Sequence, residues 1–249
     1  MTFDSKSISR ELQRIPVWFV YAVGFVPAVS YFTLGVMDRL GADPLKVLER
    51  ELGEWALRLL IAVLTITPLR QLVGINLLRY RRAVGLLAFY YVGLHLITYL
   101  VLDQGLDWAA IWADIVKRPY ITIGMTSFLL LVPLALTSNN AAIRRMGGQA
   151  WARLHKLVYV AAAGGALHFI LLVKAWPLEP LVYAAIIAVL LAYRLVRSLT
   201  KQPRSGRARS REIRPDRAPG QLAARRGEAS VATARAGVGA PSPGQQERT

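Results

Sequence analysis

Histidine is the residue type in this sequence best suited to bind a metal or move a proton, and the chain holds only three: His95, His155 and His168. His95 lies in the apolar segment YVGLHLITYL, and the other two lie in WARLHKLVYVAAAGGALHFI. A single histidine in such a segment most often bonds a neighbouring helix. The other two roles are a proton relay and the binding of a metal or haem iron. Three histidines, all in apolar segments, favour the ligand role.

Long apolar runs surround the three histidines and must position them. Hydrophobic residues make up 54% of the 249 residues, and the mean hydropathy is +0.37. A helix needs about 20 mostly apolar residues to cross a bilayer, and these runs do not alternate with the period of a strand. We therefore predict an all-α membrane protein, a bundle of six transmembrane helices. The predicted spans cover residues 15–37, 55–69, 83–102, 119–143, 157–173 and 181–193.

The depth of each histidine in the membrane predicts which of them meet. At the rise of an α-helix, His95 lies about 18 Å along the third span and His168 about 22 Å along the fifth, counted from the same side. These two imidazoles are therefore predicted to clamp one porphyrin. His155 lies thirteen residues before His168, near the inner surface, where a second haem would need it. The residue thirteen before His95 is Arg82, so an inner haem would need a different second ligand.

Small and aromatic residues add two further expectations. Gly164 and Gly165 come just before His168, where they allow helices to approach closely, make room for a flat macrocycle or permit a bend. Trp108 and Trp112 lie four residues apart, after the third span. Their spacing predicts an amphipathic helix that lies in the membrane interface.

Charge predicts the orientation of the chain. The net charge is +16, and Lys and Arg gather before the first span and in the loops after the second and fourth spans. Because positive loops stay in the cytoplasm, both termini are predicted to be cytoplasmic. The outer loops would then hold Asp38, Asp43, Glu49, Glu51 and Glu54, followed by Asp103, Asp107 and Asp114, and then Glu179.

Composition divides the chain into three segments. Residues 1–14 form a cytoplasmic N-terminal segment, residues 15–199 a six-helix transmembrane haem-binding domain, and residues 200–249 a basic cytoplasmic tail. From residue 201 onward the chain has eleven Lys and Arg against four Asp and Glu, with few large apolar residues. This composition predicts a disordered tail that lies against anionic membrane lipid. The tail has no aromatic residue for base stacking, which argues against nucleic-acid binding.

Missing residues and motifs narrow the chemistry. The chain has no cysteine, which excludes disulfides, thiolate-bound iron–sulfur clusters and haem attached through thioether bonds. A metal must therefore be held by nitrogen or oxygen ligands. The sequence also has no glycine-rich phosphate loop and no dinucleotide fingerprint.

Four segments, in this order and spacing, resemble one known family: RYRRAVGLLAFYYVGLHLITY, KRPYITIGM, LALTSN and WARLHKLVYVAAAGGALHF. They resemble the MsrQ family of haem-binding membrane subunits, which is part of the ferric-reductase-like transmembrane superfamily. The likeness covers about residues 10–199. His95, His155 and His168 match the haem-associated histidines of the family. Other superfamily members usually carry two histidines on each of two helices, whereas this chain has one on the third span.

The resemblance implies a function for the chain. It implies one or two b-type haems in a multi-pass protein of the bacterial inner membrane, which takes electrons from respiratory quinones. The electrons would pass to the periplasmic molybdenum-cofactor subunit MsrP, which reduces methionine sulfoxide in oxidised envelope proteins. Sulfoxide reduction would belong to that partner, because it needs a redox centre that this chain lacks.

Four arginines are candidates to bind a cofactor. The resemblance also implies FMN, whose phosphate would suit the basic cluster Arg79, Arg81 and Arg82. The alternative for this cluster, which we favour, is that it only marks the cytoplasmic side. Arg58 lies near the outer end of the second span, where it would neutralise a haem propionate or extend to the lipid headgroups.

Two other functions compete with the electron-transfer subunit. The first is a stand-alone ferric reductase or a superoxide-generating oxidase, which the lack of a nucleotide-binding domain disfavours. The second is a cofactor-free proton-coupled transporter, in which the histidines would relay protons. The transporter would be colourless, so the visible spectrum separates it from both haem proteins.

Overall fold

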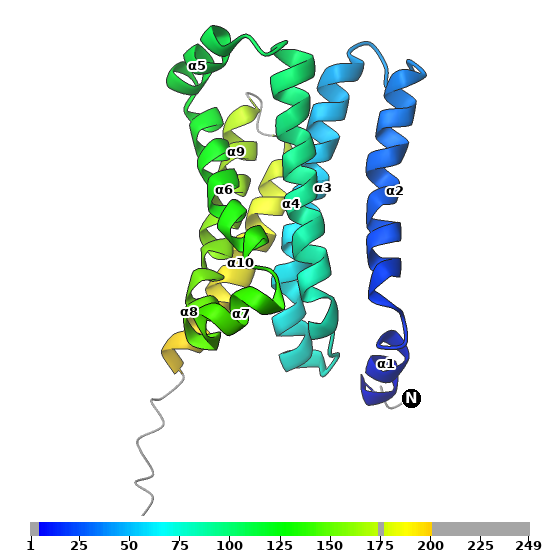
Figure 1. The fold of residues 1–249 in the computed structure, drawn as a ribbon, viewed down its shortest axis with the longest axis vertical. Coiled ribbons are helices and arrows are strands. Elements are labelled where there is room, and N and C mark those ends of the chain that lie inside the picture. Colours follow the sequence, from blue (N-terminus) through cyan, green and yellow to red (C-terminus); the bar gives the residue numbers. More distant parts are fainter. Residues whose placement is uncertain (1–4, 174–176, 201–249) are drawn as a thin grey trace, which may run out of the picture. The chain divides into compact units, whose positions relative to one another are not determined.

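The computed structural model describes residues 5–173 and 177–200, which form a helical bundle (Figure 1). Six helical stretches are long and apolar enough to cross a membrane, which confirms the predicted all-α six-span class. The first is α2 (Val17–Val36), and the second is α3 (Pro44–Pro68) with a π-helical turn, η1 (Leu69–Val73). The third joins η2 (Leu78–Tyr80), α4 (Arg81–Ile97) and a π-helical segment, η3 (Thr98–Asp103). The others are α6 (Pro119–Leu136), α8 (Gly148–Leu154) with α9 (Leu157–Leu172), and α10 (Leu178–Thr200).

Three short helices lie at the two ends of the bundle (Figure 1). Helix α5 (Trp108–Lys117) lies at one end, which we call the α5 end. Helices α1 (Ser5–Leu12) and α7 (Asn140–Met146) lie at the other, which we call the α1 end. Helix α5 is amphipathic as predicted, since Trp108 and Trp112 are both exposed. The predicted tail lies outside the described residues, apart from its first residue, Thr200.

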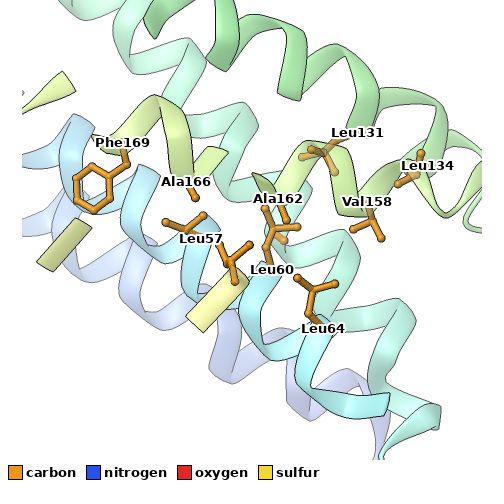
Figure 2. Close-up of a cluster of buried hydrophobic side chains, with 12 residues drawn as sticks. Leu57, Leu60, Leu64, Leu131, Leu134, Val158, Ala162, Ala166 and Phe169 are labelled. Carbon is orange, nitrogen blue, oxygen red and sulfur yellow. The ribbon is translucent and has the colours of Figure 1, made fainter. Parts of the chain in front are cut away.

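The core of the bundle lies where α3, α6 and α9 meet. Helix α3 packs mainly against α4, and α6 packs mainly against α9. Figure 2 shows leucines from α3 and α6 packed around α9, whose Ala162 and Ala166 are labelled there. Small residues on α9 let the three helices approach closely, since backbones come near only where side chains are short. The small buried residues of α9 are Ala161, Ala162 and Ala166.

Helix α3 begins eleven residues before the predicted start of the second span. The predicted placement of Glu49, Glu51 and Glu54 in an outer loop is therefore wrong, since all three lie on α3. The helix starts early because Asp43 caps it, accepting a hydrogen bond from the backbone nitrogen of Lys46 at 3.1 Å, with proline at the first helical position. Ion pairs with basic residues on the same helix offset the charge of the carboxylates.

The fourth span differs from its predicted bounds, whereas α9 matches the predicted fifth span to within one residue and is preceded by α8. Helix α6 ends at Leu136, seven residues before the end of the apolar run. The side-chain oxygen of Asn139 accepts from the backbone nitrogen of Ala142 at 2.7 Å, which starts α7 as a separate helix. The fifth span is interrupted between α8 and α9, where His155 ends α8. A bend at Gly164 and Gly165 was one expectation, but both glycines lie within the unbroken helix α9.

A buried tyrosine fixes α4 against α2, one helical turn from His95. The hydroxyl of Tyr91 donates to Gly24 O at 2.7 Å and accepts from the backbone nitrogen of Ala28 at 3.0 Å. In a regular helix these two backbone groups bond each other, and Pro27 lies between them in α2. Because Tyr91 is fully buried, the hydroxyl satisfies both groups away from water and holds α4 in place.

Candidate functional site

A cavity of about 490 Å³ lies among α3, α4, α6 and α9. Cofactor sites in proteins are typically apolar cavities of a few hundred cubic ångströms with a few polar groups that orient the ligand. His95 from α4 and His168 from α9 both line this cavity. The cavity therefore unites two of the three histidines that the sequence predicts as ligands.

The rings of His95 and His168 lie at the spacing of two ligands on one metal. Their centroids are 6.2 Å apart, and their planes cross at 80°. Two imidazoles bound to one metal from opposite sides, each through a bond of about 2 Å, have centroids about 6 Å apart. The predicted meeting of these two rings at one depth is therefore present in the structure.

Backbone carbonyls fix the tautomer of both rings. Nδ1 of His95 lies 2.8 Å from Glu49 O, and Nδ1 of His168 lies 2.7 Å from Tyr120 O. A carbonyl oxygen only accepts, so each Nδ1 must carry the hydrogen and donate it. Each Nε2 then keeps the lone pair that binds a metal, which is the arrangement seen for metal-bound histidine.

The number of protein ligands indicates what kind of metal centre fits. Within residues 5–173 and 177–200, no group of three or more His, Asp or Glu side chains is placed to hold a metal ion. Zinc, calcium and magnesium sites in proteins need more ligands than two histidines provide. A metal held here must bring its remaining ligands with it, as iron does in a porphyrin.

The cavity is polar at one end and apolar at the other. Toward the α5 end it is lined by Lys46, Arg50 and Arg118, together with acidic residues and two tyrosines. Its remaining wall is mostly apolar, and includes Phe128 and Leu131. This gradient suits a ligand that has charged groups along one edge and is otherwise apolar.

Arg58 lies beside this site and does not line the cavity. Its guanidinium donates to Glu54 Oε2 at 2.7 Å and to the hydroxyl of Tyr183 at 2.8 Å. The second oxygen of Glu54 accepts from Arg50 Nε at 2.7 Å. Glu54 itself is 3% exposed, so the two arginines balance a carboxylate that would be costly to bury alone.

His155 lies outside the cavity. Its ring stacks on Trp151, with centroids 3.9 Å apart, and its Nδ1 donates to the carbonyl of the same residue at 3.1 Å. Among the described residues, no hydrogen-bond partner reaches its Nε2, which is buried. The structure thus separates His155 from His95 and His168.

The basic cluster Arg79, Arg81 and Arg82 lies at the α1 end. The guanidinium of Arg79 donates to Gln13 O, and that of Arg82 donates to Asn140 Oδ1 at 3.2 Å. Arg81 is the first residue of α4. Two of the three arginines are thus engaged with oxygens of this chain, which ties the start of α4 to the segment after α1 and to α7.

The sequence did not predict the roles of several glycines that border the histidines. Gly53 and Gly124 each lie against a histidine ring of the cavity. Gly165 lines the cavity, whereas Gly164 faces Ser127 on α6. The only signal in the sequence is glycine inside an apolar helix, where it has a cost and needs a structural reason. The two uses predicted for Gly164 and Gly165 are therefore divided between them: close packing for the first, space in the cavity for the second.

Two histidines from different membrane helices that line one cavity in a six-span bundle are the arrangement expected of a ferric-reductase-like transmembrane protein. Residues 52–166 match the family described as ferric reductase like transmembrane component. The protein-methionine-sulfoxide reductase heme-binding subunit MsrQ of Brucella anthropi is 63% identical over 181 residues, which are 73% of this chain and 82% of that protein. Its counterparts in Brucella ovis and Brucella canis are 62% identical over the same shares. The chain belongs to the MsrQ family, as its sequence segments predicted.

Proposed function

We propose that this chain binds a b-type haem between His95 and His168 and carries electrons as the membrane subunit of a protein-methionine-sulfoxide reductase. One observation carries the proposal: the two rings lie 6.2 Å apart with both Nδ1 atoms bonded to carbonyls. The haem would be held without covalent attachment, because the chain has no cysteine. The relatives named above are heme-binding subunits, which supports the same cofactor here.

The residues around the cavity suit the parts of a haem. His95 and His168 would supply the axial nitrogens, and the apolar wall would contact the porphyrin and exclude water. Lys46, Arg50 and Arg118 line the α5 end and are the cations able to pair with the two carboxylates of a porphyrin. We therefore assign this role to them in place of Arg58, which does not line the cavity.

Haem iron takes up and releases a single electron, which is the chemistry that the bound group supplies. The work of this chain is to hold the iron at a fixed depth. The orientation follows from charge: Arg79, Arg81 and Arg82 lie at the α1 end, which we therefore place in the cytoplasm of a bacterial inner membrane. Electrons would enter from respiratory quinones and leave at the α5 end.

The acceptor would be the periplasmic molybdenum-cofactor subunit MsrP, which would carry out sulfoxide reduction. This assignment rests on the family and on the name of its members, which are subunits of a protein-methionine-sulfoxide reductase. The cavity of this chain is lined by the two histidines that would hold the haem, so we assign the sulfoxide chemistry to the partner.

Flavin binding at the arginine cluster has less support. The hydrogen bonds from Arg79 and Arg82 to oxygens of this chain indicate that the cluster joins the segments of the α1 end. An FMN phosphate would have to compete with those acceptors. We therefore infer that the cluster marks the cytoplasmic side and stabilises the loop before α4.

The proposal is tested by purifying the full chain from the membranes of cells that are grown with a supply of haem. A reduced-minus-oxidised spectrum of a b-type haem is expected, and reduced protein should be reoxidised when purified MsrP and methionine sulfoxide are added. Reoxidation by a ferric chelate but not by MsrP would support the stand-alone ferric reductase instead. A colourless protein would contradict haem binding and favour the transporter.

A further inference from the structure

Both cavity histidines bond a carbonyl that lies four residues before a glycine. His95 bonds Glu49 O, and Gly53 follows four residues later on α3. His168 bonds Tyr120 O, and Gly124 follows four residues later on α6. The same arrangement therefore occurs twice, on two helices that face the cavity from different sides.

Helix geometry explains why the residue four positions later matters. In an α-helix the N–H of that residue donates to the same carbonyl oxygen, which has a second lone pair for another donor. The Cα–Cβ bond of a helical residue tilts toward the N-terminus of the helix. A side chain at that position therefore leans over the carbonyl and blocks the approach of a second donor.

The distances show how closely each glycine meets its histidine. A Cβ added to Gly53 would lie 3.2 Å from His95 Nδ1, and a Cβ added to Gly124 would lie 2.8 Å from His168 Nδ1. The first distance is tight and would move the ring slightly. The second is shorter than real Cβ contacts, so the ring or the helix would have to shift.

We propose that Gly53 and Gly124 are positioning residues for the two haem ligands. Without a Cβ at these positions, each Nδ1–H reaches a backbone carbonyl, which sets the tautomer and directs Nε2 into the cavity. This inference rests on the proposed haem site. Gly93 provides the contrast, because it lies on α4 two residues before His95 and a Cβ there would meet no atom within 4 Å.

The hydrogen bond at Nδ1 also sets the electronic character of each ligand. A bond donated from Nδ1 makes the imidazole a stronger donor through Nε2, and this favours ferric over ferrous iron. Weakening that bond should therefore raise the midpoint potential of the haem. Because the contact at Gly124 is closer than the one at Gly53, the larger shift is expected at Gly124.

The experiment compares Gly53→Ala and Gly124→Ala with Gly93→Ala as the matched control, each in the full chain. Three quantities are measured: haem per protein, the low-spin electron paramagnetic resonance (EPR) spectrum, and the midpoint potential. Gly93→Ala should match the unmodified protein. Gly53→Ala should keep its haem but show a raised potential and changed g-values, and Gly124→Ala should show a larger change or lose haem.

The outcomes separate this inference from the proposed function. Unmodified protein without haem would overturn the proposed function and this inference with it. Haem that is present and unchanged in potential and spectrum in both test variants would overturn the positioning role alone. An equal shift in Gly93→Ala would overturn it too, because any added methyl group would then have the same effect. If Gly124→Ala does not accumulate, Gly53→Ala decides the question.

Discussion

The cavity and the region around His155 both contain an imidazole that bonds a backbone carbonyl through Nδ1, yet they differ in what lies beyond Nε2. His95 and His168 face each other across a cavity, and their acceptors belong to neighbouring helices. His155 bonds the carbonyl of Trp151, which lies one helical turn earlier in the sequence, and its ring stacks on the indole of Trp151. A histidine in a membrane helix thus becomes a candidate ligand through its surroundings, because a second imidazole and space for a macrocycle must both be present.

The largest effect is expected when either cavity histidine is removed. His95→Ala or His168→Ala leaves the iron with a single protein ligand and opens space beside it. In either variant, the haem that is bound by two histidines should be lost almost completely. Haem per protein and the low-spin EPR signal measure this loss. If both variants keep this haem in full amount, the pairing of these two residues is wrong.

Filling the cavity should come next in size. A Cβ on Gly165 would meet Leu57 at an ordinary 3.6 Å, but the rest of a leucine side chain would enter the space beside His168. Gly165→Leu should therefore lower haem content several-fold while the bundle still folds. The control is Val160→Leu on the same helix, at a side chain 58% exposed, which should keep its haem. Equal haem content in both variants would show that Gly165 does not border the ligand.

The buried carboxylate should affect stability more than haem chemistry. Glu54→Ala leaves Arg50 and Arg58 without the group that each bonds at 2.7 Å. Both arginines are partly exposed, so the expected cost is that of lost hydrogen bonds to a charged group, about 1.5 kcal/mol or more, and the melting temperature in detergent should fall clearly. The matched control is Glu11→Ala, whose ion pair with Arg14 is exposed. The free energy of unfolding of this variant should fall by less than about 0.5 kcal/mol. Similar melting temperatures in the two variants would contradict a structural role for Glu54.

The smallest effect on the cavity haem is expected at His155. His155→Ala removes an aromatic contact worth about 1 kcal/mol, but it leaves every residue around the cavity in place. The EPR signal of the haem between His95 and His168 should therefore persist with unchanged g-values. Loss of that signal would show that the two regions depend on each other, contrary to their separation in the structure.

Much of the fold followed from the sequence because the bilayer imposes a simple length rule. Long apolar runs, one of them broken by Arg58, predicted six spans, and counting residues along two of them placed His95 and His168 at one depth. The start of α3 was missed because Glu49, Glu51 and Glu54 read as a loop, whereas ion pairs with Lys46, Arg50 and Arg58 allow them to lie on a helix.

The finer features of the site depended on tertiary contacts that a sequence does not display. Arg58 and Arg50 are both arginines of α3, and only the structure shows that Arg50 lines the cavity whereas Arg58 bonds Glu54 and Tyr183. Likewise, Gly53 and Gly124 resemble any glycine in an apolar helix until the carbonyls that the histidines bond are known. The helical turn α8 before His155 was missed because Arg153 and Lys156 mark the edge of the apolar run, which was predicted to begin at residue 157.

The most direct test of the account is the EPR spectrum of the purified ferric protein. With His95 and His168 as the two ligands, and ring planes crossing at 80°, the account predicts a strongly anisotropic low-spin signal, typical of crossed imidazole planes. This signal should disappear in His168→Ala and persist in His155→Ala. A protein without haem, or a haem signal that is unaffected in His168→Ala, would contradict it.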